Sequence, residues 1–132
     1  METVKIRCKD LMVGDWVANR NGSPMQIVAV DEDNAYAWTG NEERPWIFGD
    51  NEGYEPQPIV LTPEILEKNG WKETEYWHEY QDGKNTIQCC LPDMRGRING
   101  IEIEHFKCEY VHQYQHLFRL CGLNELANNF KI

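Results

Sequence analysis

The sequence lacks the run of about 18 apolar residues that a membrane-spanning helix needs. Its first ten residues carry charges where a secretory signal peptide requires an apolar stretch. Basic residues are scarce, since 13 lysines and arginines stand against 22 aspartates and glutamates, a net charge of −9. This balance disfavours broad binding to nucleic-acid phosphates. We therefore expect a cytoplasmic protein without a membrane segment, and nucleic acid is not the expected partner.

The familiar catalytic and cofactor motifs are also missing. There is no GxSxG, no phosphate-binding P-loop, no GxGxxG and no CxxC. The five cysteines are odd in number, and adjacent Cys89 and Cys90 would face opposite sides of a strand, so neither a mutual bridge nor a shared metal suits them. We expect reduced thiols, most of them in the core, and no bound cofactor.

A chain of 132 residues, 41% of them hydrophobic, is long enough for a hydrophobic core of its own. We predict a single α+β domain over residues 1–132. It would comprise an SH3-like β subregion over 1–61 and a helix-hairpin-helix subregion over 62–132. We expect the two subregions to unfold as one cooperative unit.

The first half reads as short strands joined by tight turns. Residues 3–9 alternate between apolar and basic side chains, as a half-buried strand does. Leu11–Val17 supplies a turn and the start of a second strand, of the kind that opens many SH3-like barrels. Two more strands are predicted over 25–30 and 35–38, separated by turn-forming residues. The pattern indicates a small, bent antiparallel sheet.

The second half mixes strands with two helices. Thr62 is a good N-cap, Pro63 suits the first helical position and Asn69-Gly70 ends a short connector helix. A strand that includes both Ile101 and Phe106 would need a bulge near Glu104-His105. The strands predicted for this half cover 58–61, 71–81, 86–91 and 101–108.

The last predicted element is an amphipathic helix over 110–120. Its apolar stripe, which we expect to pack on the second sheet, consists of Val111, Tyr114, Phe118 and Cys121. Its polar face would be exposed and is a candidate binding surface. That face consists of His112, Gln115, His116 and Arg119.

Acidic residues concentrate in one segment. Residues 31–55 hold eight aspartates and glutamates against Arg44 alone, a net −7 of the −9. This segment contains a long loop, 39–57, that is rich in Gly, Asn, Glu and Pro yet carries aromatic side chains. The aromatic residues either pin the loop to the core or mark a binding surface. The first candidate surface consists of Trp46, Phe48 and Tyr54.

Metal binding by histidine has weak support. His112 and His116 stand four residues apart on one helical face, but Gln113 replaces the glutamate of an HExxH motif. A third ligand would have to be His105, Cys90 or Cys108. A Cys108 or Cys121 thiol paired with His112 is an equally weak catalytic alternative. We therefore expect neither a metal site nor a catalytic set.

Two further patterns point to minor alternatives. Carboxylates at i and i+2 on predicted strands, Glu73 with Glu75 and Glu102 with Glu104, could serve acid–base chemistry but also describe a solvated strand face. Basic residues could form a small single-strand site if they converged with Trp16 or Trp71. They are Lys5, Arg7, Lys9, Arg95 and Arg97.

Three segments together resemble a known family. They are Leu11–Val17, Pro58–Trp71 and Tyr110–Phe118, the last reading YVHQYQHLF. In this order they resemble a family of small uncharacterised proteins of Bacteroides and related gut bacteria, often encoded in phage-like or mobile elements. The chain departs from the family pattern at Tyr114, His116 and Phe118. The resemblance implies a cytoplasmic accessory protein and supplies no catalytic residue.

These observations favour a non-enzymatic protein-interaction or accessory protein, for which another protein is the expected partner. Its fifteen aromatic residues, its focused acidic segment and its lack of catalytic motifs carry this interpretation. The alternatives are a small nucleic-acid-associated protein and, third, a metal-dependent enzyme.

Overall fold

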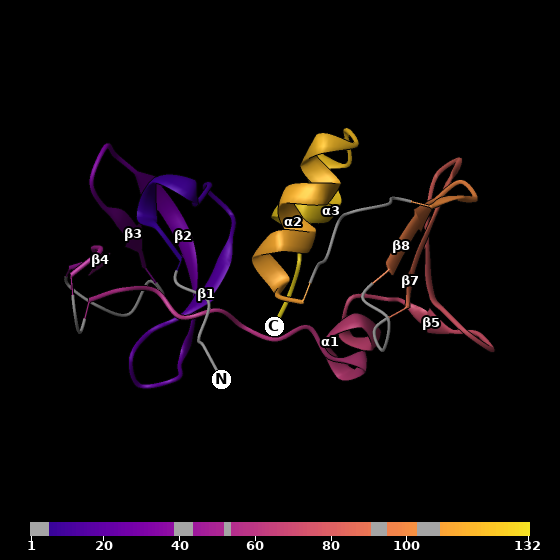
Figure 1. Cartoon of the computed structure of the whole chain (residues 1–132), viewed down its shortest axis with the longest axis horizontal. Coiled ribbons are helices and arrows are strands. Elements are labelled where there is room, and N and C mark those ends of the chain that lie inside the picture. Colours follow the sequence, from indigo (N-terminus) through magenta and orange to yellow (C-terminus); the bar gives the residue numbers. More distant parts are fainter. Residues whose placement is uncertain (1–5, 39–43, 52–53, 91–94, 103–108) are drawn as a thin grey trace. The chain divides into compact units, whose positions relative to one another are not determined.

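A computed structural model of the chain describes residues 6–38, 44–51, 54–90, 95–102 and 109–132. It has an α+β fold with two antiparallel sheets and short helices, as the sequence predicts (Figure 1). None of the helices in these ranges is long and apolar enough to cross a membrane. The chain divides into two compact units, the first comprising residues 1–59 with 110–130 and the second 60–109 with 131–132.

The C-terminal helices therefore group with the first sheet, so the units differ from a simple division at residue 61. Whether the chain unfolds as one cooperative unit stays a prediction.

The first unit contains a four-stranded meander in the order β1-β2-β3-β4. A register shift between Ile27 and Ala29 introduces an irregularity into β2, and Val28 there is exposed. The strands are β1 (Trp16–Ala18), β2 (Pro24–Val30), β3 (Ala35–Ala37) and β4 (Trp46–Phe48). The predicted second, third and fourth strands are confirmed, whereas β4 lies inside the segment predicted to be a loop. An SH3-like closure of this sheet stays a prediction.

The strand predicted over 3–9 is wrong where the structure describes it. Cys8–Asp10 forms a 3-10 helix (η1), because Leu11 N–H donates to the Cys8 carbonyl and Cys8 N–H donates to the Asp50 carboxylate. The alternation that suggested a strand is nevertheless real, since Ile6 and Cys8 are buried. These two residues join a core cluster with Leu11, Val17, Met25, Ile27, Ala35, Ala37 and Phe48.

Helices α2 (Val111–Leu120) and α3 (Asn124–Asn128) complete the first unit. The helix predicted over 110–120 is confirmed, and α3 was not predicted. Val111, Tyr114 and Phe118 are buried as expected, but Cys121 is exposed. Within the first unit α2 contacts α3 and β1, and the expectation that it packs on the second sheet, which belongs to the other unit, stays a prediction.

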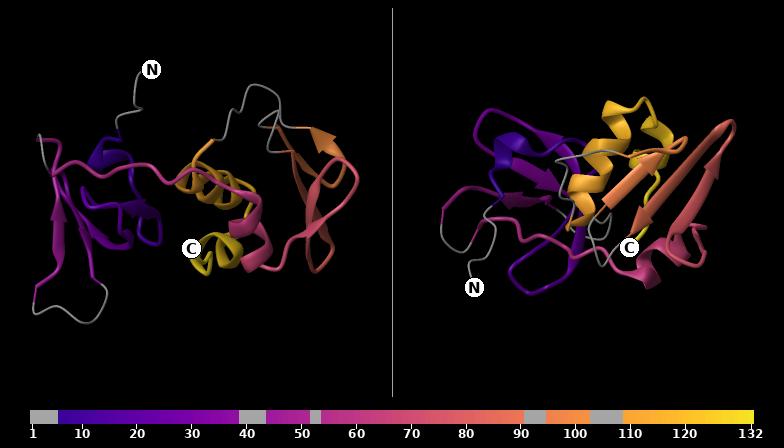
Figure 2. Two further views of the ribbon diagram at one scale, coloured as in Figure 1. Left: turned by 90° about the horizontal axis from the view of Figure 1, so that it is seen from below. Right: turned by 45° about the vertical axis from the view of Figure 1, so that its right-hand side comes forward.

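The second unit contains α1 (Pro63–Lys68) and a five-stranded antiparallel sheet (Figure 2). The predicted N-cap is present, since Thr62 Oγ1 accepts the Ile65 N–H at 3.3 Å. The strands, in the sheet order β5-β6-β7-β8-β9, are β5 (Lys72–Glu73), β6 (His78–Asp82), β7 (Asn85–Cys90), β8 (Arg95–Ile98) and β9 (Ile101–Glu102).

Two strand predictions for this half need correction, and a third is not tested. The segment 71–81 is not one strand, because a turn at 74–77 divides it into β5 and part of β6. The segment 58–61 is not a strand, since the nearby pairing is an isolated bridge between Ala18 and Gln57. The bulge expected near Glu104-His105 lies outside the described residues.

Candidate functional site

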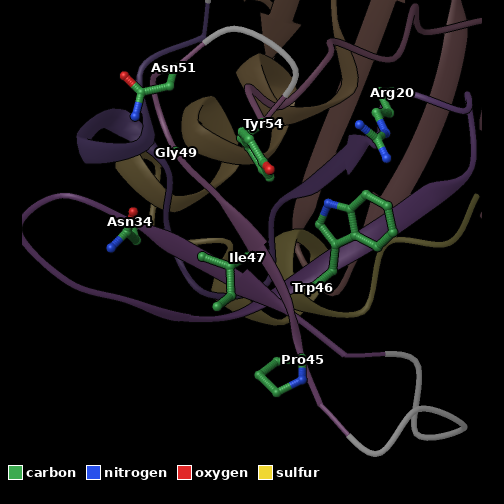
Figure 3. A pocket seen from close by; sticks show the side chains of 8 residues that line it. All are labelled: Arg20, Asn34, Pro45, Trp46, Ile47, Gly49, Asn51 and Tyr54. Carbon is green, nitrogen blue, oxygen red and sulfur yellow. The ribbon is translucent and has the colours of Figure 1, made fainter.

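The main candidate site is a pocket of about 510 Å³ beside β4 in the first unit (Figure 3). Its apolar lining comes from β4 and from Tyr54, and a single arginine, Arg20, contributes the charge. Figure 3 shows Tyr54, Trp46 and Ile47 around the hollow, with the Arg20 guanidinium near the Trp46 ring. The lining residues are Arg20, Asn34, Pro45, Trp46, Ile47, Gly49, Asn51 and Tyr54.

Alternation along β4 separates Ile47 from Phe48, whereas Trp46 packs partly against the core cluster and also lines the pocket. Ala35 pairs with Phe48, Tyr36 with Ile47 and Ala37 with Trp46. Because side chains alternate along a strand, Ile47 and Phe48 lie on opposite faces. Phe48 is only 1% exposed and belongs to the core, whereas Ile47 is 52% exposed.

The first predicted surface is therefore only partly correct. Trp46 and Tyr54 do line one pocket, and Tyr54 is 61% exposed. Phe48 is a core residue and cannot contact a partner. The prediction missed Ile47, which also lines the pocket. Had a strand been recognised over Trp46–Phe48, its alternation would have placed Ile47 opposite Phe48.

Acidic residues neighbour part of the pocket lining in the sequence. Asp33 and Asp50 are exposed and adjoin the lining residues Asn34, Gly49 and Asn51. Asp31 is held in a turn, where its carboxylate accepts the backbone N–H groups of residues 33 and 34 and the Tyr36 hydroxyl. The hydrogen bond from Tyr36, followed by those from the backbone, lowers the pKa of Asp31 below its usual range.

The second predicted surface, the polar face of α2, is wrong. Gln115 is completely buried and His112 is 8% exposed. Gln115 Oε1 accepts the Trp16 N–H at 2.8 Å, and its Nε2 donates to the carbonyls of Gly14 and Ala127 at 2.7 and 2.8 Å. This face holds the 12–16 loop and α3 within the first unit, so it is a structural contact.

His116 and Arg119 belong to the same contact. His116 Nε2 lies 2.6 Å from Asp15 Oδ2, and Arg119 Nη1 donates to Asp15 Oδ1 at 2.5 Å. The Asp15 carboxylate is fully buried and also accepts the Met12 N–H at 2.8 Å. A buried aspartate was not predicted, because the Gly14-Asp15 pair resembles an ordinary surface turn.

The histidine pair of α2 does not form an open metal site. The rings of His112 and His116 meet edge to face at 5.8 Å, but His116 Nε2 already contacts Asp15. Burial, with a smaller contribution from His116, lowers the pKa of His112 to about 4, against an opposing effect of Asp15. His105 and Cys108 lie outside the described residues, and Cys90 belongs to the other unit.

The cysteines that the structure describes form no disulfide bond. Cys8, Cys89 and Cys90 are buried and Cys121 is exposed. Burial, together with the nearby Asp50 carboxylate, raises the pKa of Cys8 to about 11. Such a thiol is protonated at neutral pH, so Cys8 is not an activated nucleophile.

One of the two predicted carboxylate pairs is not formed as such, and the other is not tested. Glu75 lies in the turn that follows β5, so it does not share a strand face with Glu73. Glu102 pairs with Arg95, at 3.2 Å between Nη1 and Oε1, and Glu104 lies outside the described residues.

The basic residues of the second unit meet an aromatic ring that was not predicted. Arg97 and Arg95 stand over Trp77, 4.9 and 5.5 Å from the ring centroid, rather than beside Trp71 or Trp16. Tyr76, the preceding residue, is 73% exposed. Trp77 was missed because the segment 71–81 was taken as one strand without a turn.

We found no family model, curated protein or solved structure that matches this chain.

Proposed function

We propose that this chain is a non-enzymatic protein-interaction module, and that its binding surface is the pocket beside β4. The observation that carries the proposal is the cluster of Trp46, Ile47 and Tyr54 around a hollow of about 510 Å³ with Arg20 at its side. Tryptophan, tyrosine and arginine are the residue types that dominate the binding energy of protein interfaces.

The proposed occupant is an extended segment of a partner protein that carries a bulky apolar side chain and basic residues. The apolar side chain would fill the hollow, because its walls are aromatic and aliphatic. The basic residues would lie near Asp33, an exposed residue that precedes the lining residue Asn34 in the sequence. The Arg20 guanidinium would donate to backbone carbonyls of the segment.

The position of β4 in its sheet favours an extended partner. It is the last strand in the order β1-β2-β3-β4, so one of its edges has no neighbouring strand among the described residues. An exposed edge beside an apolar pocket is the geometry that β-augmentation uses, in which backbone hydrogen bonds give affinity and side-chain pockets give specificity.

A displayed library of extended peptides tests this proposal with purified protein. Peptides selected on the wild type should share an apolar anchor next to basic residues. They should lose at least tenfold in affinity against an Ile47→Asp/Tyr54→Ala variant. Tyr76→Ala is the matched control, because it removes an equally exposed aromatic side chain from the other unit.

Binding to basic peptides should also weaken with salt, because Asp33 is exposed to solvent and its charge is screened by added ions. If no selected peptide distinguishes the wild type from the Ile47→Asp/Tyr54→Ala variant, the proposal is wrong. A dimer that Ile47→Asp converts to a monomer in light scattering would replace the partner segment by a second copy of the chain.

A small nucleic-acid-associated protein is the second candidate function. The observation that favours it is the placement of Arg95 and Arg97 over Trp77, next to exposed Tyr76. Aromatic rings with guanidinium groups can stack successive bases of a single strand. Anisotropy with labelled single-stranded oligonucleotides tests it, since binding should be abolished by Tyr76→Ala/Trp77→Ala and weakened by salt.

A further inference from the structure

We propose a binding site for a divalent transition-metal cation, with zinc as the model ion, formed by Glu67, Glu73 and His78 in the second unit. One potential ligand atom of each residue lies within 4.8 Å of those of the other two. The set comprises two carboxylates and one imidazole, which are ligands that zinc and its neighbours accept. This site is separate from the β4 pocket, and none of its residues belongs to the predicted histidine set of α2.

Two of the ligands are positioned by strand pairing. Glu73 of β5 and His78 of β6 are direct partners in the antiparallel register. Direct partners have Cβ atoms about 4.5–5.5 Å apart, so their side chains meet on one face of the sheet. The intervening turn is tied by Thr74, whose N–H and Oγ1 both contact the Trp77 carbonyl, at 2.6 and 2.9 Å.

The third ligand comes from the end of α1. The Glu67 carbonyl accepts the Gly70 N–H, and Trp71 N–H returns to the Leu66 carbonyl, which closes the helix directly before β5. Gly70 has a φ of +86°, a conformation that glycine adopts without strain. The buried Trp71 side chain then fixes this junction against Tyr80, at 5.6 Å between ring centroids.

The chemistry of the three side chains points to a cation. Glu67 and Glu73 bring two negative charges together, and neither forms an ion pair with a lysine or arginine in the described part of the chain. His78 Nε2 is buried and has no hydrogen-bond partner there, which leaves a polar atom of this side chain unsatisfied. A cation shared by the three would relieve the carboxylate repulsion and engage the imidazole.

The separations between the three ligand atoms, which reach no more than 4.8 Å, are near those that a bound zinc requires. Zinc holds nitrogen and oxygen ligands at about 2.0–2.2 Å, so its ligand atoms lie about 3.5 Å apart. Glu67 and Glu73 are exposed, and rotation of their side chains can shorten the present separations of up to 4.8 Å. Three protein ligands leave at least one coordination position open to water or to a fourth donor.

Zinc titration of the full-length, reduced and chelator-treated protein tests the proposal by calorimetry. We expect one site whose affinity falls at least about tenfold in Glu67→Gln, in Glu73→Gln and in His78→Gln, since even changes around a ligand cost that much. Glu64→Gln and Glu75→Gln are matched controls, because they remove the same charge from α1 and from the adjoining turn without removing a ligand.

A second measurement locates the ion and separates this site from thiol binding. Cobalt should broaden the amide NMR signals of residues 67–78, and this broadening should disappear in Glu73→Gln. Because Glu73 is exposed, the Glu73→Gln variant should keep its fold, and the amide spectrum itself checks this. Absence of zinc binding by the wild type, equal affinity in the three ligand variants and the two controls, or broadening elsewhere would each overturn the proposal.

Discussion

Arg119 donates to the buried carboxylate of Asp15 at 2.5 Å across 104 residues of sequence. The guanidinium also donates to the Val13 carbonyl at 3.1 Å, while the Asp15 carboxylate accepts the Met12 N–H and contacts His116. The ion pair therefore attaches the 12–16 loop to α2 within the first unit. Because the carboxylate is fully buried, removing it leaves the charge of Arg119 poorly compensated.

We predict that Asp15→Ala lowers the free energy of unfolding by about 3–5 kcal/mol, the usual cost of breaking a buried ion pair from one side. Chemical denaturation of the purified variant measures this change. The exposed pair of Arg95 and Glu102, with side chains 48% and 41% exposed, is the internal control. Glu102→Ala should cost less than about 1 kcal/mol, and equal effects of the two substitutions would refute the structural role assigned to Asp15.

Gln115 joins the same loop to α2 and α3 through neutral hydrogen bonds. We predict that Gln115→Ala destabilises the protein by about 2–4 kcal/mol, because it leaves buried backbone groups of Trp16 and Ala127 without their partner. The Gly14 carbonyl is affected less, since Gln26 Nε2 also donates to it at 3.1 Å. Leu120→Ala on the same helix, at a position 79% exposed, should change stability by less than about 0.5 kcal/mol.

The sequence predicted the helix α2 and most of its apolar stripe correctly, but not which of its polar residues are buried. Helical periodicity correctly placed Val111, Tyr114 and Phe118 on the buried side. The same periodicity predicted exposure for Gln115, because a polar residue opposite an apolar stripe is normally solvated. Its burial depends on the backbone of a loop about a hundred residues earlier, and no local pattern contains that contact.

The short strands and the candidate sites also depend on contacts between distant segments that no local sequence pattern contains. β4 has three residues and lies in a segment rich in glycine and acidic residues, so its alternation was too brief to recognise. The aromatic residues there suggested a surface, but only recognition of the strand separates buried Phe48 from exposed Ile47. Likewise, Glu67, Glu73 and His78 become neighbours only when a turn divides the segment 71–81 and brings β5 and β6 into register.

The two aromatic residues Phe48 and Tyr54 should respond in opposite ways to truncation. Phe48→Ala should lower the free energy of unfolding by about 3–5 kcal/mol, because it leaves a cavity in the core. Phe48 is only 1% exposed. Tyr54→Ala should leave stability within about 0.5 kcal/mol and alter binding alone. Thermal and denaturant unfolding of both variants measures the difference, and a large loss in Tyr54→Ala would show that its ring packs into the fold.

The thiols should react in an order that follows their burial. Among the described cysteines, Cys121 should be alkylated first, since it is exposed whereas Cys8, Cys89 and Cys90 are buried. Cys8 should be the most resistant below pH 10, because its pKa of about 11 keeps the thiolate scarce. Timed alkylation followed by peptide mass spectrometry measures the order, and denaturant should abolish it. Early labelling of Cys8 in the folded protein would contradict its placement in the core.

Acidification should destabilise the first unit through His112. Burial lowers the folded-state pKa of this residue to about 4, from an unfolded value of about 6.5. The unfolded chain therefore binds the proton first. The stability that neutral His112 supports is fully present above pH 6.5 and is lost as the pH falls toward 4, by about 3 kcal/mol over that range. Unfolding free energies measured between pH 7 and pH 4 will show this slope.

His112→Phe isolates the contribution, because it keeps an aromatic ring beside Tyr110, which stacks on the imidazole at 6.2 Å, and cannot take up a proton. The variant should lose less stability than the wild type between pH 6.5 and pH 4, whatever its stability at pH 7. The two proteins differ only at residue 112, so the difference between the two slopes measures the effect of replacing the His112 imidazole. Identical slopes would mean that His112 is protonated in the folded protein as readily as in the unfolded chain.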